Sequence, residues 1–170
     1  MNHLFAKAHL RNDEPCTHCK VVRKNSKQSC KEILTVFPVD SESGEEKALV
    51  IKSLEFAGDK FLQTAIVIKN KLDQDKSLSA KKIRALHNCL RLYQGGSRSF
   101  GFGLRAFRAQ NYQHFNFKWL KGAQHDVVEC ERNLNMAGVD VEQLGIKSSY
   151  LLELVDAAHE AVRCLSTKLM

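Results

Sequence analysis

A chain of 170 residues is long enough to bury a sizeable core in one domain, either alone or with a small appendage. Only two prolines occur, which favours an all-helical protein over a sheet. No apolar run approaches the roughly 18 residues that span a bilayer, so we expect a soluble protein with no membrane contact. The net charge of +7 points to polyanions or acidic protein surfaces as partners.

The N-terminal part is expected to form an appendage to the main domain. Residues 1–15 show no periodic pattern, so we expect a loosely ordered N-terminus. Residues 16–38 predict a short helical extension that carries cysteines and ends at a proline. Burial alone cannot hold so short a segment folded, and a disulfide would pin it, joining either Cys19 or Cys16 to Cys30.

Four long amphipathic helices are predicted next, because apolar residues recur at alternating spacings of three and four. A polar linker at 39–44 precedes the first helix, whose acidic start at Glu45 suits the helix dipole. Ser77 or Ser79 is the expected N-cap of the second helix. The predicted apolar stripes are Ile51, Leu54, Gly58, Phe61, Ala65, Ile68 and Leu72 in the first helix; Ile83, Leu86, Leu90, Tyr93, Ser97, Phe100, Leu104 and Phe107 in the second; Leu120, Ala123, Val127, Cys130 and Leu134 in the third; and Leu144, Leu151, Leu154, Ala158, Ala161 and Leu165 in the fourth. Ser97 and Lys147 are the misfits in these stripes.

Short loops between these helices predict an all-α fold, an antiparallel up-down-up-down four-helix bundle over residues 45–168 with an N-terminal short helical hairpin extension. A polar break at 109–113 lies midway between Cys89 and Cys130. An antiparallel helical hairpin therefore brings these two cysteines level on neighbouring helices, where a disulfide can form. The second helix contains several glycines, each costing roughly 1 kcal/mol relative to Ala, so we expect a bend or a loosened turn there. These glycines are Gly95, Gly96, Gly101 and Gly103.

The positive charge is concentrated in residues 76–125, which hold ten lysines and arginines and no Asp or Glu, while the rest of the chain is net −3. Within this segment, four arginines spaced by seven predict a column beside the apolar stripe. This basic stripe consists of Arg84, Arg91, Arg98 and Arg105. We interpret it as a contact surface for a polyanion or an acidic protein face, and the alternative is a solvated helix face.

The six cysteines, two of them well placed to pair, favour a disulfide framework and an oxidising compartment. Residues 1–15 nevertheless contain charges and histidines and no apolar core region, so the chain as written is expected to carry no secretory signal peptide. Three explanations stay open: the numbering starts downstream of a signal, the gene prediction lost it, or the protein stays inside the cell with reduced cysteines. The pairing of Cys16 and Cys164 is left open.

No residue pattern predicts catalysis, and we expect no metal and no cofactor. The Cys16-Thr17-His18-Cys19 run is interpreted as part of a structural cystine, because no second pair follows at zinc-finger spacing and no strands favour a redox motif. His87 and His125 fall near the level of the predicted disulfide, which leaves a weak two-histidine site as an alternative to partly exposed polar positions. No phosphate loop, nucleophile elbow or paired carboxylate occurs, so we expect a binding protein.

Nucleic acid is an alternative partner, because aromatic residues that can stack on bases are interleaved with the basic residues. Most of them lie on the apolar stripe or at its edge, which favours a place in the core. They are Tyr93, Phe100, Phe102, Phe107, Tyr112, Phe115, Phe117 and Trp119.

The predicted second and third helices resemble the plant invertase and pectin methylesterase inhibitor family. The residues that match are the run Leu86-His87-Asn88-Cys89-Leu90-Arg91-Leu92-Tyr93, the Asn111-Tyr112 turn, and Cys130 with Leu134 four residues later. They are similar to the family's leucine, cysteine and tyrosine pattern, its Asp-Tyr-like turn and its second cysteine. The resemblance extends over roughly residues 16–165.

The resemblance implies a non-catalytic, secreted, monomeric bundle with two disulfides, Cys19–Cys30 and Cys89–Cys130. It implies an inhibitor in the cell wall, or apoplast, that covers the active-site cleft of a pectin methylesterase one-to-one, or alternatively inserts into that of an acid invertase. The basic stripe would engage an acidic rim of the enzyme or acidic pectin. The implied partner-binding residues surround the central cysteine pair and are Arg91, Tyr93, Gln94, Gly95, Arg98, Asp126 and Glu129.

The chain departs from the family pattern in several ways, including the spacing of Cys19 and Cys30 and the glycines of the predicted second helix. Glu129 replaces the usual Thr before the second hairpin cysteine, and Val155 stands where some members have a fifth cysteine. The Pro-Lys-Phe motif of invertase inhibitors is absent after Cys130, which favours the esterase as the target. The alternative of another class is a non-inhibitory basic bundle that binds a polyanion such as pectate or nucleic acid.

Overall fold

The computed structural model describes residues 45–109 and 118–169, and this part of the chain forms four α-helices and no strand. The helices are α2 (Glu45–Gln74), α3 (Ala80–Arg108), α4 (Lys118–Met136) and α5 (Ser148–Leu169). The all-helical prediction is therefore confirmed for these residues. The predicted appendage at 1–38, with its Cys19–Cys30 pair, lies outside the described residues, as does most of the predicted break at 109–113.

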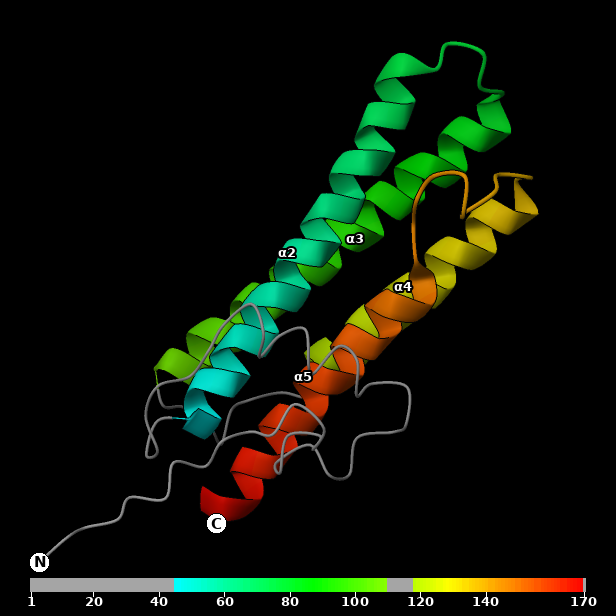
Figure 1. Cartoon of the computed structure of the whole chain (residues 1–170). Coiled ribbons are helices and arrows are strands. Elements are labelled where there is room, and N and C mark those ends of the chain that lie inside the picture. Colours follow the sequence, from blue (N-terminus) through cyan, green and yellow to red (C-terminus); the bar gives the residue numbers. More distant parts are fainter. Residues whose placement is uncertain (1–44, 110–117, 170) are drawn as a thin grey trace, which may run out of the picture.

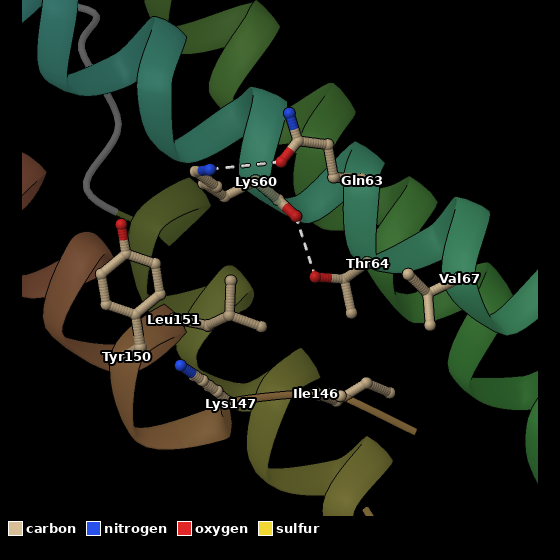
Figure 2. Close-up of a pocket in the computed structure, with 9 residues that line it drawn as sticks. Lys60, Gln63, Thr64, Val67, Ile146, Lys147, Tyr150 and Leu151 are labelled. Atoms are coloured by element: carbon tan, nitrogen blue, oxygen red, sulfur yellow. Dashed lines mark hydrogen bonds between the residues drawn. The ribbon is translucent and has the colours of Figure 1, made fainter. Parts of the chain in front are cut away.

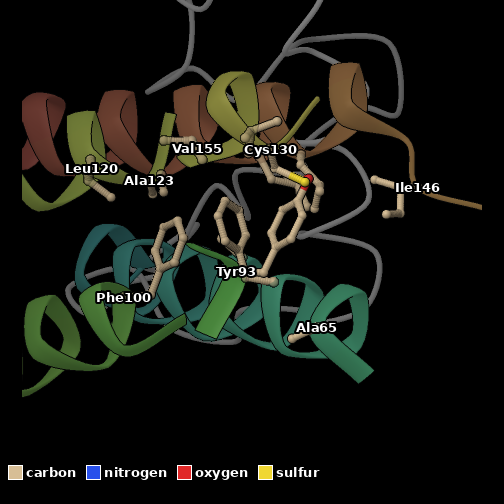
Figure 3. Packing of buried hydrophobic residues seen from close by; sticks show 14 of the residues in the cluster. Ala65, Tyr93, Phe100, Leu120, Ala123, Cys130, Ile146 and Val155 are labelled. Atoms are coloured by element: carbon tan, nitrogen blue, oxygen red, sulfur yellow. The ribbon is translucent and has the colours of Figure 1, made fainter. Parts of the chain in front are cut away.

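The four helices lie lengthwise beside one another and enclose a single apolar core (Figure 1). Helix α2 packs against α3 and α5, and α4 packs against the same two helices. At the centre, the ring of Phe61 meets Tyr93 and Phe100 edge-on, with ring centroids 5.5 and 5.2 Å apart (Figure 3). None of these helices is both long enough and apolar enough to cross a membrane.

The predicted apolar stripes agree with the observed burial at most positions. All five stripe residues of α4 are buried, and so are Leu54, Phe61 and Ile68 of α2. The prediction is wrong at Ile83, which is 38% exposed near the start of α3. Ser79 caps α3 as expected, since its hydroxyl accepts a hydrogen bond from the backbone N–H of Lys82.

The loosened turn predicted at the glycines of α3 does not occur, because the helix continues without a break from Ala80 to Arg108. Two glycines instead allow α2 and α3 to approach closely. A Cβ at position 58 would lie 3.1 Å from Cβ of Phe100, and one at position 96 would lie 2.4 Å from Cδ1 of Phe61. Packing against α2 thus overrides the low helix propensity of glycine.

The fourth helix begins later than its apolar pattern suggested. The chain between α4 and α5 turns twice, at Gly138 and Gly145, both of which have the positive φ that glycine adopts without strain. Leu144 lies in this connection, so its assignment to the helix is wrong. Lys147 ends the connection immediately before α5, which explains why it broke the predicted stripe.

Candidate functional site

The predicted cross-link between the second and third helices is present as a disulfide between Cys89 of α3 and Cys130 of α4. Their Cα atoms are 4.8 Å apart, and both residues are completely buried. Both cysteines belong to the buried core cluster, so the bond joins the two helices from inside the bundle. The outer surfaces of α3 and α4 beside it form the α3–α4 face, the candidate functional site.

The α3–α4 face carries six of the seven residues implied as partner contacts. Arg91, Gln94 and Arg98 are exposed on α3. Gly95 is partly buried because Asp126 of α4 lies beside it, and a Cβ at position 95 would be 4.0 Å from Oδ2 of Asp126. The structure therefore brings Gly95 and Asp126 together across the two helices.

Tyr93 is the exception, and its assignment to the contact surface is wrong. The side chain is completely buried, with its ring packed edge-on against Phe61. Burial raises the pKa of Tyr93, as do the negative charges of Glu131 and Asp126, whereas the neighbouring Ser148 hydroxyl lowers it. Tyr93 therefore stays neutral at physiological pH and belongs to the core, as its place on the apolar stripe predicted.

The two carboxylates of the α3–α4 face are in opposite electrostatic environments. Burial raises the pKa of Asp126, and the charge of nearby His125 opposes this shift. The pKa of Glu129 is lowered, chiefly by a hydrogen bond from Arg132 whose Nη2 atom lies 2.7 Å from Oε1. Asn133 donates to the same oxygen at 3.3 Å. Glu129 is thus held as a charged group by its own helix, while Asp126 bears a desolvation cost.

All four arginines of the basic stripe are exposed, as predicted. Arg91 donates a hydrogen bond to Oδ1 of Asn88 at 3.0 Å, and the guanidinium of Arg105 lies 4.7 Å from the centroid of the Phe102 ring. Within residues 45–109 and 118–163, no carboxylate forms an ion pair with any of the four. Arg108, outside the stripe, pairs with Glu55 of α2 instead.

An aromatic pair lies beside the stripe and belongs to the set of interleaved aromatic residues for which the sequence analysis favoured a place in the core or at its edge. Phe102 is 51% exposed, and its ring centroid lies 6.3 Å from that of Trp119 at the start of α4. Because Arg105 stacks on Phe102, this corner of the α3–α4 face combines apolar area with positive charge. The sequence contained this information, since Phe102 is not a position of the predicted apolar stripe, and its neighbours Phe100 and Gly103 are the buried residues of this turn.

Metal binding finds little support on this face. His87 and His125, the weak two-histidine alternative, are both exposed. In the described part of the chain, no three His, Cys, Asp or Glu side chains gather in a way that could hold a metal ion. The exposed arginines, Gln94 and Phe102 of this face can contribute charge, hydrogen bonding and apolar contact to recognition.

Comparison with known proteins found no family model, no curated protein and no solved structure that matches this chain. The α3–α4 face is consequently the main basis for a functional proposal. Its features are a buried cross-link, arginines with no ion-pair partner among the described residues, a glycine against an aspartate, and an exposed phenylalanine.

Proposed function

We propose that this protein is a non-catalytic inhibitor that binds a pectin methylesterase one-to-one and covers its active-site cleft, and so modulates pectin de-esterification in the cell wall. The observation that carries the proposal is the buried Cys89–Cys130 bond that joins α3 to α4, with Arg91 and Arg98 exposed on α3. A cross-linked pair of helices presents its surface already ordered, which reduces the entropy lost on binding.

The proposal includes several finer features. The four helices have an antiparallel up-down-up-down order, which the short connection of residues 75–79 between α2 and α3 supports. A short helical hairpin precedes them, closed by a second disulfide between Cys19 and Cys30. The protein is an extracellular monomer in the apoplast, where disulfides persist and where pectin and its esterases occur.

The charge distribution favours a target with an acidic rim. The stripe arginines have no carboxylate partner in the described part of the chain, so an acidic surface can pair with them without first breaking an ion pair. Such charge complementarity accelerates association and selects among partners. An acid invertase is the alternative target within the same inhibitor class.

The test is a residual-activity titration of the purified, oxidised protein against a plant pectin methylesterase and a plant acid invertase in parallel. We expect esterase activity to be lost near one equivalent of protein while invertase activity persists. The reverse pattern would replace the proposed target, and loss of neither activity would contradict the inhibitor proposal.

Variants locate the contact surface in this assay. Arg98→Glu on α3 should weaken inhibition roughly tenfold or more, as expected for a charged contact at the centre of an interface. Lys69→Glu is the matched control, because it reverses one charge at an exposed position of α2, away from the α3–α4 face. Equal effects of both substitutions would show that net charge, and not this face, matters.

A second candidate function is binding of a polyanion such as pectate or nucleic acid. It is favoured by the exposed arginines of the basic stripe and by the exposed Phe102 ring, which can stack on a base. Affinity for oligogalacturonate or single-stranded DNA should then fall steeply as salt rises. Arg84→Gln and Arg105→Gln should weaken this binding more than they weaken esterase inhibition, since neither residue is among the implied partner contacts around the central cysteine pair.

A further inference from the structure

A pocket of about 230 Å³ lies between α2 and the start of α5, on helices that do not contribute to the α3–α4 face. Its walls come from α2, from the connection that precedes α5 and from the first turn of α5 (Figure 2). Pockets for drug-sized ligands usually measure about 300–1,000 Å³. The size of this pocket therefore suits a smaller molecule.

Two lysines line the pocket, and no Asp or Glu does. The Nζ atom of Lys60 lies 3.3 Å from Oε1 of Gln63 and 5.2 Å from the centroid of the Phe56 ring. Neither Lys60 nor Lys147 has an ion-pair partner in the part of the chain that the structure describes. Two unpaired positive charges at one pocket repel each other, and a bound anion would relieve this repulsion.

The start of α5 adds to this positive character. The backbone N–H of Leu151 donates to the carbonyl oxygen of Lys147 at 3.1 Å, which makes Lys147 the residue that caps the helix. A lysine side chain has only donors, so the Lys147 side chain cannot accept a hydrogen bond from a backbone N–H of the first turn. That turn also contains no acidic residue. No acidic side chain of this first turn therefore offsets the positive end of the helix dipole.

The remainder of the pocket is largely apolar. Ile146 and Leu151 are buried beneath it, Val67 borders it with 39% of its surface exposed, and the ring of Tyr150 lies close to Lys147 (Figure 2). A bare inorganic ion would leave these apolar surfaces uncovered. A ligand with an apolar group would cover these surfaces, and their removal from water would contribute favourable free energy to binding.

We propose that this pocket binds a small organic anion that carries an apolar group. The carboxylate or phosphate of the ligand contacts the ammonium groups of Lys60 and Lys147, and its apolar part packs against Val67 and Leu151. This site is independent of the proposed inhibitor function, since it shares no residue with the α3–α4 face.

The test is an NMR titration of the full, ¹⁵N-labelled chain with benzoate, phenyl phosphate, inorganic phosphate and benzyl alcohol. We expect saturable one-to-one shifts of the Ser148 and Ser149 amides with benzoate and phenyl phosphate. Benzyl alcohol should bind far more weakly because it lacks the charge, and inorganic phosphate because it lacks the apolar group. Absence of saturable shifts with all four probes would overturn the proposal, as would equal binding of benzyl alcohol.

Lysine variants test whether benzoate binds at this pocket. Lys60→Met and Lys147→Met should each weaken benzoate binding roughly threefold to tenfold, the range expected for loss of one charge-assisted contact that is partly screened by water. Lys69→Met is the matched control, an exposed lysine of α2 outside the pocket, and should bind as wild type does. Unchanged affinity in the Lys60→Met/Lys147→Met double variant would overturn the assignment, with thermal unfolding used to verify that the variant is folded.

Discussion

Gly96 of α3 lies directly against the ring of Phe61 of α2. A Cβ at position 96 would be 2.4 Å from Cδ1 and 2.6 Å from Cε1 of Phe61, closer than carbon atoms approach without a shift. The ring has little room to move, because it is completely buried and packs edge-on against Tyr93 and Phe100. This contact therefore sets how closely α2 and α3 pack.

Gly96→Ala should lower the free energy of unfolding by about 1–3 kcal/mol, the usual cost of overpacking a core, although alanine has the higher helix propensity. Gly101→Ala is the matched control in the same helix, since a Cβ there would meet no atom within 4 Å. It should stabilise the protein by roughly 1 kcal/mol. Urea unfolding measures both values, and similar effects at the two positions would contradict the role assigned to Phe61.

The Cys89–Cys130 disulfide should contribute about 4 kcal/mol to the free energy of unfolding, because it closes a loop with a sequence separation of 41 residues. Chemical unfolding of wild type with and without a thiol reductant measures this contribution. The Cys89→Ala/Cys130→Ala variant is the control, since any further effect of reductant on it reports the other four cysteines. Equal stability of oxidised and reduced wild type would refute the prediction.

Asp126 should make stability fall as the pH rises. Its folded-state pKa is raised by burial above the model-peptide value of 3.8, so the folded state binds the proton more tightly than the unfolded state does. The stabilisation is therefore fully present below pH 3.8 and is lost as the pH rises through the folded-state pKa. Asp126→Asn should exceed wild type in stability at pH 7, with the difference shrinking as the pH falls, measured by thermal unfolding across pH.

Glu129 provides the control of opposite sign. Its pKa is lowered by Arg132, so its contribution is present above the unfolded-state pKa and disappears as the pH falls through the folded-state value. Glu129→Gln should accordingly be less stable than wild type at pH 7 and equal to it in acid. If both variants change stability in the same direction at pH 7, the environments assigned to these two carboxylates are wrong.

Trp119 should serve as a fluorescence reporter of the α3–α4 face, since it is the only tryptophan in the chain. Its ring lies against that of Phe102, so Phe102→Ala should expose it to water and shift its emission to longer wavelength. Ile66→Ala removes a similarly exposed apolar side chain from α2 and should leave the emission unchanged. An unshifted spectrum for Phe102→Ala would mean that the aromatic contact does not form in solution.

The helices were predictable because their apolar spacing is long and regular. The stripe of α4 matches the observed burial at every position, and the level placement of Cys89 and Cys130 follows from the rise of a helix. The packing role of the glycines in α3 was not predicted. Sequence periodicity placed Ser97 on the apolar stripe, whereas the structure buries its neighbour Gly96. The ring of Phe61, from α2, occupies the space where a side chain at position 96 would lie.

The start of α5 and the pocket beside it were less predictable, because both depend on conformation and packing that apolar spacing does not report. Leu144 fits the apolar period of a helix, but the positive φ of Gly145 directs the chain into a turn, and glycine alone does not reveal which φ it adopts. Tyr93 could have been excluded from the contact surface, since its own stripe position implied burial. Lys60 and Lys147 line the same pocket because of tertiary packing, which the spacing of apolar residues does not report.

The buried position of the Cys89–Cys130 bond has a kinetic consequence. Neither cysteine has any surface in contact with solvent, so an attacking thiolate can reach the sulfur atoms only after α3 and α4 separate locally. The rate of reduction therefore reports how often the bundle opens, and at high reductant concentration it becomes limited by the opening itself. The lifetime of the disulfide in a reducing medium is thus set by the rate at which α3 and α4 open locally.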